Sequence, residues 1–264
     1  MVGISTATLF TRRNNEDAAT LLSEWKIPTA EIFLTSFCEY SREFASLVKK
    51  RLNDTAVHSV HVLNTQFEPQ LYAEHERVKR DAYEWLGRSM EAARVLGAKY
   101  YTFHGIARLK RTFRERLPEF ARSTQEIFGF CQKYGVTLCY ENVEWALYNR
   151  PGIFSELKKG CPKLKGVLDI KQARISGYDY REYLNEMGAD ITHVHVSDLD
   201  ENGKLCLPGK GTFDFDELFV RLRDFGFHGA ILIENYNNDY GKESELKDSF
   251  EWLSEKAEKY FPQQ

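Results

Sequence analysis

Short apolar segments alternate with longer amphipathic segments along the whole chain, and this alternation constrains the fold more than any other feature. The short segments are rich in β-branched and aromatic residues, which is typical of buried parallel strands. The candidate strands comprise residues 2–9, 30–34, 56–63, 99–105, 136–143, 165–170, 191–198 and 230–235. Between them, apolar side chains recur at three- and four-residue spacing, which predicts helices. The candidate helices comprise residues 16–25, 42–52, 71–96, 115–134, 153–159, 180–187, 214–225 and 245–260.

Glycine residues mark several junctions between these helices and strands. Gly97, Gly135, Gly188 and Gly226 each follow a candidate helix and shortly precede a candidate strand. Glycine is favoured there because it ends a helix in the left-handed conformation without steric cost. Strand–helix repeats of this kind in 264 residues predict a (β/α)8 TIM barrel, a fold of about 250 residues.

We expect one domain over residues 1–264, because no Ser/Pro-rich linker or shift in composition divides the chain. A doubly wound open sheet is the alternative fold, but no GxGxxG motif follows the first candidate strand.

Composition narrows the class of protein. The chain has 36 Lys and Arg residues against 39 Asp and Glu residues, a net charge of −3, and a hydrophobic fraction of 42%. This balance excludes a disordered chain and argues against nucleic acid or membrane as a partner. Five scattered cysteines without a CxxC motif, and no signal-peptide pattern or membrane-spanning apolar run, predict a reduced, cytoplasmic protein. A homo-oligomer is compatible with these features.

Polar residues lie near the carboxyl ends of several otherwise apolar candidate strands. They are His61, His104, Glu141, Asp169, His195 and Glu234. A single acid in such a place is usually a helix cap or a loop acceptor, but three acids and three histidines at the catalytic face of a barrel predict a shared site. Converging carboxylates need positive charge, and a divalent metal ion supplies it. A set of carboxylates and one imidazole suits Mn²⁺, Co²⁺, Fe²⁺ or Zn²⁺ better than Ca²⁺.

Several of these strand ends carry a resemblance to a known family. The segments LCYEN, GVLDIKQA, HVHVSD, LPGKGTFDF and ILIENY occur in this order. They resemble the motifs of the xylose-isomerase-like sugar phosphate isomerase/epimerase superfamily, which also includes endonuclease IV. The resemblance covers nearly the whole chain and is strongest over residues 136–236. It implies the TIM-barrel fold and one divalent metal ion.

The resemblance also implies the metal ligands. The family's four ligands fall on Glu141, Asp169, His195 and Glu234. His195 is preferred to His193 because, like the family's ligand, it precedes an x-[SN]-D tail, here Val-Ser-Asp.

One position departs from the family pattern. A histidine often follows the aspartate by three residues, and here that residue is Gln172. Endonuclease IV needs that histidine and a later Asp-x-His for three zinc ions, and LPGKGTFDF offers neither. We therefore expect one metal ion, with Gln172 binding a sugar hydroxyl together with His61, His104 and Lys171.

Three other features of the sequence each allow two interpretations. Lys171 either points into the barrel mouth in the strand phase of Asp169 or is a solvated loop lysine. Lys210 in PGKG belongs either to a phosphate-binding nest or to a simple turn. Trp145 and Tyr148 either form an apolar wall for a sugar ring or pack internally.

Two further glutamates lie in or shortly after the second candidate strand. Glu39 is expected to be a charge at a helix N-terminus. Glu31 is expected to end the second strand, with no assigned function.

The leading functional hypothesis is an isomerase or epimerase of carbohydrate metabolism that acts on a small sugar or keto-sugar. Glu141 and Glu234 would transfer the proton through an ene-diolate intermediate. The alternative is a dehydratase of the inosose or dehydroshikimate type that uses the same site. An endonuclease IV-like repair enzyme is disfavoured by the charge and the missing zinc ligands. A non-catalytic carbohydrate-binding barrel is disfavoured by the complete ligand set.

Overall fold

The computed structural model describes residues 1–63, 67–107 and 113–262, and its centre is a closed barrel of eight parallel strands. The barrel strands are β1 (Val2–Ser5), β2 (Thr29–Leu34), β3 (Ala56–Val62), β4 (Tyr100–Phe103), β5 (Thr137–Glu141), β6 (Lys165–Asp169), β7 (Ile191–Val196) and β10 (Ala230–Ile233). Sequential strands lie side by side, and β10 pairs with β1 to close the barrel. The predicted (β/α)8 TIM barrel is confirmed.

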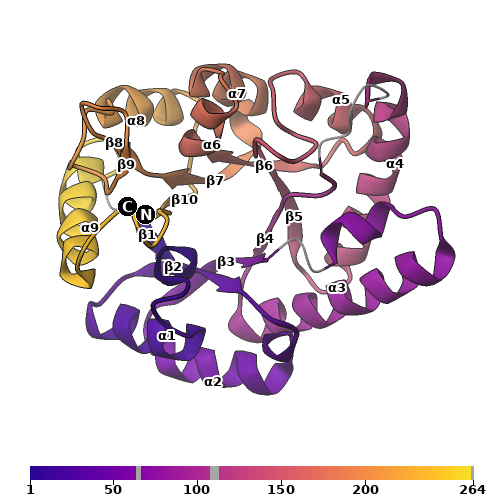
Figure 1. Ribbon diagram of the computed structural model, residues 1–264, viewed down its shortest axis with the longest axis horizontal. Helices are drawn as coiled ribbons and strands as arrows, with labels where there is room; N and C mark the ends of the chain where they lie inside the picture. Colours follow the sequence, from indigo (N-terminus) through magenta and orange to yellow (C-terminus); the bar gives the residue numbers. More distant parts are fainter. Residues whose placement is uncertain (64–66, 108–112, 263–264) are drawn as a thin grey trace.

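Helices surround this barrel on its outside (Figure 1). They are α1 (Asn15–Glu24), α2 (Arg42–Leu52), α3 (Glu76–Leu96), α4 (Phe113–Gln132), α5 (Ile153–Gly160), α6 (Ile170–Ile175), α7 (Tyr180–Met187), α8 (Phe215–Asp224) and α9 (Glu243–Glu258). Strand side chains such as Ile32, Val60 and Val194 are fully buried in the hydrophobic core that joins strands to helices. Within the described ranges, no helix has both the length and the apolarity needed to cross a membrane.

The interior of the barrel, in contrast, is polar. Side chains alternate between the two faces of a strand, so every second residue of each strand points inward. The strand register pairs Glu31 with Ser5 and with Ser59, and Asp169 with His195. All five side chains are buried. The hydrophobic core therefore lies outside the strands, and hydrogen-bonding and charged groups fill the barrel at these levels.

Several predicted element boundaries are wrong at the carboxyl ends of strands. β1 ends at Ser5, and Thr6–Leu9 form a 3-10 helix whose Ala7 N–H donates to the Ser5 side chain. The segment predicted as one helix over 71–96 contains the end of a 3-10 helix, Glu68–Tyr72, before α3 begins at Glu76. Helix α6 and the β8 (Asp198–Leu199) and β9 (Leu205–Cys206) hairpin were not predicted, because these elements are too short to show a period.

The close packing of β1 against β2 leads to a prediction about the stability of the barrel. A Cβ atom at Gly3 would lie 2.1 Å from the backbone carbonyl oxygen of Thr29. We predict that Gly3→Ala lowers the free energy of unfolding by about 1–3 kcal/mol, the usual cost of overpacking, measured by urea denaturation. The control is Gly129→Ala in α4, where a Cβ meets nothing within 4 Å, and which should not destabilise. Equal stability of both variants would contradict this packing.

Candidate metal centre

Four potential ligands converge at the carboxyl end of the barrel. Glu141 and Asp169 are the last residues of β5 and β6, His195 lies near the end of β7, and Glu234 follows β10 directly. One side-chain atom from each of the four lies within 4.8 Å of the others. The Glu141 and His195 side chains are only 2% and 0% exposed, and that of Glu234 is 11% exposed. The four residues predicted from the sequence therefore form one cluster at the barrel mouth.

The imidazole of His195 connects the carboxylates. Its Nδ1 lies 2.8 Å from Glu141 Oε1 and 3.3 Å from Glu234 Oε2. Burial alone would lower the pKa of His195, but the negative charges of Glu234, Glu31 and Glu141 raise it well above its ordinary value. The same attraction holds the pKa of Glu141 well below its ordinary value, although burial opposes this.

Three carboxylate oxygens of these candidate ligands lack a hydrogen-bond partner among the described residues. They are Glu141 Oε2, Asp169 Oδ2 and Glu234 Oε2, all buried atoms. Burial raises the pKa of Asp169 to about 6, against the opposing charge of Lys171. Unpaired buried carboxylate oxygens are costly, and a cation would relieve that cost. Together with the imidazole nitrogen, these donors fit one Mn²⁺, Co²⁺, Zn²⁺ or Fe²⁺ ion.

The two other predicted histidines line the same pocket. His104 Nε2 lies 2.9 Å from Glu141 Oε2 and 2.9 Å from His61 Nε2. Burial lowers the pKa of His104, but Glu141 and Glu68 overcome this effect and raise it to about 10. Glu68 is fixed in turn by the Tyr101 hydroxyl, which donates to its Oε1 at 2.6 Å. The contact with Glu141 thus favours the protonated form of His104.

Lys171 also lies in this pocket, although not on a strand. Helix α6 begins at Ile170, so the expected regular strand phase is wrong. The side chain is nevertheless only 2% exposed, and Nζ lies 3.6 Å from Asp169 Oδ2 and 3.6 Å from Glu234 Oε1. The interpretation as a solvated loop lysine is therefore wrong, and Lys171 is a buried cation beside both carboxylates.

Gln172 lies at the edge of the pocket. Its backbone N–H donates to Asp169 Oδ1 at 2.9 Å, and its Oε1 accepts from the Glu144 N–H at 3.2 Å. Its Nε2 lies 3.4 Å from the hydroxyl of Tyr236, a side chain half open to solvent. The amide oxygen is therefore engaged by the protein, and the amide nitrogen is the group that faces outward.

Other sequence expectations are corrected here. Tyr148 is fully buried and donates to Glu186 Oε2 at 3.1 Å, so it packs internally, whereas Trp145 is 37% exposed with its ring 5.3 Å from that of His104. Glu39 is not a charge in the first turn of a long helix. It lies buried in a 3-10 turn and accepts from Asn15 Nδ2 at 3.0 Å.

The PGKG segment forms a turn filled by the protein's own carboxylate. The N–H groups of Gly209 and Gly211 both donate to Asp198 Oδ2, at 3.0 Å and 3.1 Å. Lys210 therefore belongs to a simple turn, because Asp198 already occupies the backbone N–H donors that a phosphate would need.

Glu31 was missed as a site residue. It does not end β2 but lies in its middle, fully buried, with Oε1 3.0 Å from His195 Nε2. A single acid inside an otherwise apolar strand was the available signal, since a buried carboxylate must be paired.

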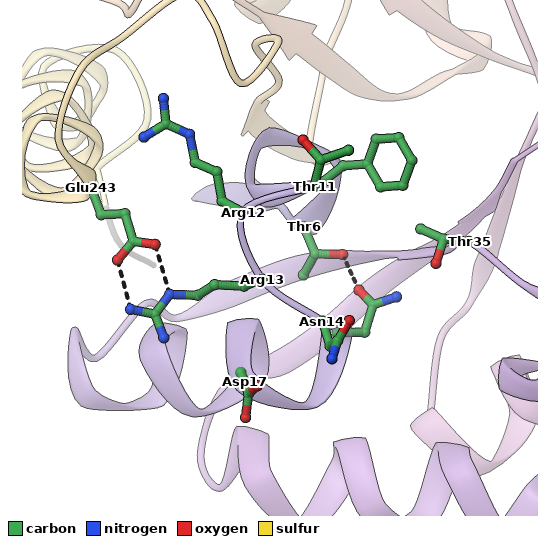
Figure 2. A pocket seen from close by; sticks show the side chains of 10 residues that line it. Thr6, Thr11, Arg12, Arg13, Asn14, Asp17, Thr35 and Glu243 are labelled. Atoms are coloured by element: carbon green, nitrogen blue, oxygen red, sulfur yellow. Dashed lines mark hydrogen bonds and ion pairs between the residues drawn. The ribbon is translucent and has the colours of Figure 1, made fainter.

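A second hollow of about 410 Å³ lies beside the barrel mouth, where the loops after β1 and β2 meet the start of α9 (Figure 2). Arg13 binds both carboxylate oxygens of Glu243 at 2.7 Å, and Thr6 donates to Asn15 at 2.7 Å. Phe10 also lines this hollow and contacts Phe33, whose ring lies 5.0 Å from that of His61. A chain of ring contacts, Phe10–Phe33–His61, therefore runs from this hollow to the candidate metal centre.

Comparison with known proteins identifies the family. The family described as xylose isomerase-like TIM barrel matches residues 21–256. The chain belongs to this family. The resemblance inferred from the strand-end motifs is confirmed.

One relative and several solved structures are similar to this chain. An uncharacterized protein of Methanocaldococcus jannaschii is 31% identical over 199 residues, which cover 69% of this chain and 67% of the relative. The structure of a zinc-bound IOLI protein superposes with a TM-score of 0.81 at 16% identity and covers 99% of both chains. The 3-keto-D-glucoside 4-epimerase YcjR of E. coli gives 0.76 at 16% identity, covering 96% of this chain and 98% of that one. A D-psicose 3-epimerase gives 0.76 at 13% identity and covers 98% of both chains. These structures share the fold.

The geometry of the four ligands predicts metal-dependent stability. Because a cation would bind the folded chain and not the unfolded one, Mn²⁺, Co²⁺ or Zn²⁺ at a hundred times its dissociation constant should stabilise the chelator-treated protein by about 2.7 kcal/mol. Calorimetry should show this as a raised melting temperature. His195→Ala should abolish the rise, whereas His75→Ala, at an exposed position before α3, should keep it. A rise that survives His195→Ala would place the ion elsewhere.

Proposed function

We propose that this chain is a divalent-metal-dependent isomerase or epimerase of a sugar or keto-sugar. The observation that carries the proposal is the convergence of Glu141, Asp169, His195 and Glu234 within 4.8 Å at the mouth of the barrel. That is the face at which TIM-barrel enzymes hold their catalytic groups. The sugar epimerases among the structures that share this fold support the same reaction class.

The four converging residues would hold the metal ion. When bound, the ion supplies positive charge to two neighbouring substrate oxygens and so acidifies the adjacent C–H bond. Asp169 and His195 serve chiefly as ligands in this proposal. Both are buried and are held from neighbouring strands, β6 and β7.

Glu141 and Glu234 are proposed as the acid/base pair. They extend from β5 and from the end of β10, and two barrel strands, β6 and β7, lie between β5 and β10. Their carboxylates therefore reach a substrate in the mouth from different sides. One removes a proton from carbon to give an ene-diolate, and the other, or the same one, returns it to the neighbouring carbon or the opposite face.

Cationic donors beside these carboxylates are proposed to bind substrate oxygens. His104 is an imidazolium next to Glu141, and Lys171 lies next to Glu234. A hydroxyl or developing enolate oxygen between them would accept from both groups, which stabilises negative charge where it forms. His61 and the amide nitrogen of Gln172 complete the donors around the mouth.

Aromatic side chains at the rim suit the apolar faces of a sugar ring. Phe10, Trp145 and Tyr236 are 39%, 37% and 49% exposed. Trp145 contacts His104, and the Tyr236 ring lies 4.5 Å from Lys171 Nζ. The pocket thus offers polar donors at its base and flat apolar surfaces at its edge.

Proton exchange tests the reaction class directly. The Mn²⁺- or Co²⁺-loaded protein should be incubated with aldoses, ketoses, keto-acids and inososes in D₂O, and deuterium at carbon followed by NMR. Incorporation next to a carbonyl, with an isomer or epimer as product, is expected. Exchange with loss of water would indicate the dehydratase alternative, and absence of exchange across the panel would contradict the proposal.

Paired substitutions separate proton transfer from metal binding. We predict that Glu141→Gln or Glu234→Gln lowers turnover by about 10²–10⁴-fold, the usual contribution of a positioned general base, while part of the metal affinity remains. Asp169→Asn should act through metal affinity, so excess Mn²⁺ should restore part of its activity. Metal content and rate must be measured on the same samples. Near-normal turnover of both metal-loaded Glu→Gln variants would place the base elsewhere.

A further inference from the structure

A buried carboxylate lies one layer deeper in the barrel than the four proposed ligands. Glu31 is fully buried in β2. Hydroxyl groups from three different strands donate to it: Ser5 at 3.1 Å, Ser59 at 2.7 Å and Thr102 at 2.5 Å. Because these donors are themselves fixed in strands, the carboxylate is held in one orientation.

In this orientation, one carboxylate oxygen of Glu31 faces the ring of His195. Glu31 Oε1 lies 3.0 Å from Nε2 of His195, while Nδ1 of the same ring faces Glu141 and Glu234 at 2.8 Å and 3.3 Å. The two ring nitrogens of His195 thus face different groups. One is directed at a carboxylate inside the barrel and the other at the pocket in the barrel mouth.

We infer that Glu31 is a positioning residue for metal binding, acting through His195. This inference rests on the proposed function. With the ring proton on Nε2, which lies 3.0 Å from the Glu31 carboxylate, Nδ1 keeps its lone pair and faces Glu141 and Glu234. The negative charge of Glu31 also makes the imidazole a stronger donor to a cation. Losing such a partner of a metal-binding histidine typically weakens metal affinity by about 10–100-fold.

The competing interpretation is that Glu31 binds a second metal ion. Glu31, His193 and His195 also bring one atom each to within 4.8 Å. However, both nitrogens of His193 are engaged, Nε2 with the Thr102 hydroxyl at 2.8 Å and Nδ1 with the Thr192 hydroxyl at 3.0 Å. Thr102 in turn donates to Glu31. A group whose donors and acceptors already satisfy one another does not need a cation, so Glu31 is assigned to His195.

The test is the metal affinity of Glu31→Gln, with Glu68→Gln as a matched control. Glu68 is an equally buried glutamate, and its Oε2 lies 3.6 Å from Nδ1 of His104, a histidine outside the proposed ligand set. Co²⁺ and Zn²⁺ affinities of the chelator-treated proteins would be measured by competition with a chromophoric chelator. The visible absorption of bound Co²⁺ would report the ligand geometry.

For Glu31→Gln we expect affinity weakened by about 10–100-fold and an altered Co²⁺ spectrum. Glu68→Gln should keep both the affinity and the spectrum of the native chain. Equal losses in the two variants would mean that removing either buried carboxylate charge near the site weakens binding, which overturns the role of Glu31. Two ions bound per native chain, falling to one in Glu31→Gln, would support the competing interpretation instead.

If Glu31→Gln does not fold by circular dichroism, Glu31→Asp takes its place. It keeps the charge inside the barrel but withdraws the carboxylate from His195 by one methylene group, so weaker binding is again expected. A native chain that binds no divalent ion overturns the proposed function. A native chain that binds one ion, with unchanged affinity in the folded Glu31 variant, overturns the role of Glu31 alone.

Discussion

The contact of one buried imidazole with carboxylates on both of its sides is the interaction on which the rest of the site depends. His195 has Glu31 at one ring nitrogen and Glu141 and Glu234 at the other. Without that ring, Glu31, Glu141 and Glu234 would lose the cationic partner that they share at low dielectric. His104 and Lys171 would remain as cations beside Glu141 and Glu234. The ring joins the carboxylate inside the barrel to the two carboxylates at its mouth, so the polar interior and the candidate metal centre form one network.

Such an interior is tolerated because the barrel does not depend on it for hydrophobic burial. The apolar side chains of the strands, among them Ile32, Val60 and Val194, face the helices and form the continuous core. Polar groups can then occupy the inside of the strands, provided that each finds a partner. Hydroxyls from β1, β3 and β4 donate to Glu31 inside the barrel. Outside the strands, Tyr101 donates in the same way to Glu68 of the 3-10 helix Glu68–Tyr72. Three carboxylate oxygens at the mouth, on Glu141, Asp169 and Glu234, lack hydrogen-bond partners among the described residues, and this is where a ligand is expected.

The fold and the convergence of the candidate strand-end ligands were accessible from the sequence because both leave local signals. Period, glycine caps and segment length predicted the barrel, and the family match over residues 21–256 agrees with it. Glu141, Asp169 and Glu234 stood out because each is an acid at the end of an apolar segment. In a parallel barrel all such ends meet at one rim, so topology alone predicts that they converge.

Only the tertiary structure decided two kinds of feature. One is contact between residues that are distant in the chain, and the other is the direction of side chains that depends on a local turn. Glu31 reaches His195 across the barrel, and nothing near Glu31 in the sequence names that partner. Lys171 enters the pocket because α6 starts directly after Asp169, a turn too short to leave a period. Tyr148 and Glu39 are buried by partners at Glu186 and Asn15. A sequence pattern records which face of an element is buried, whereas the pairing of polar groups inside a barrel is fixed only when the strands close.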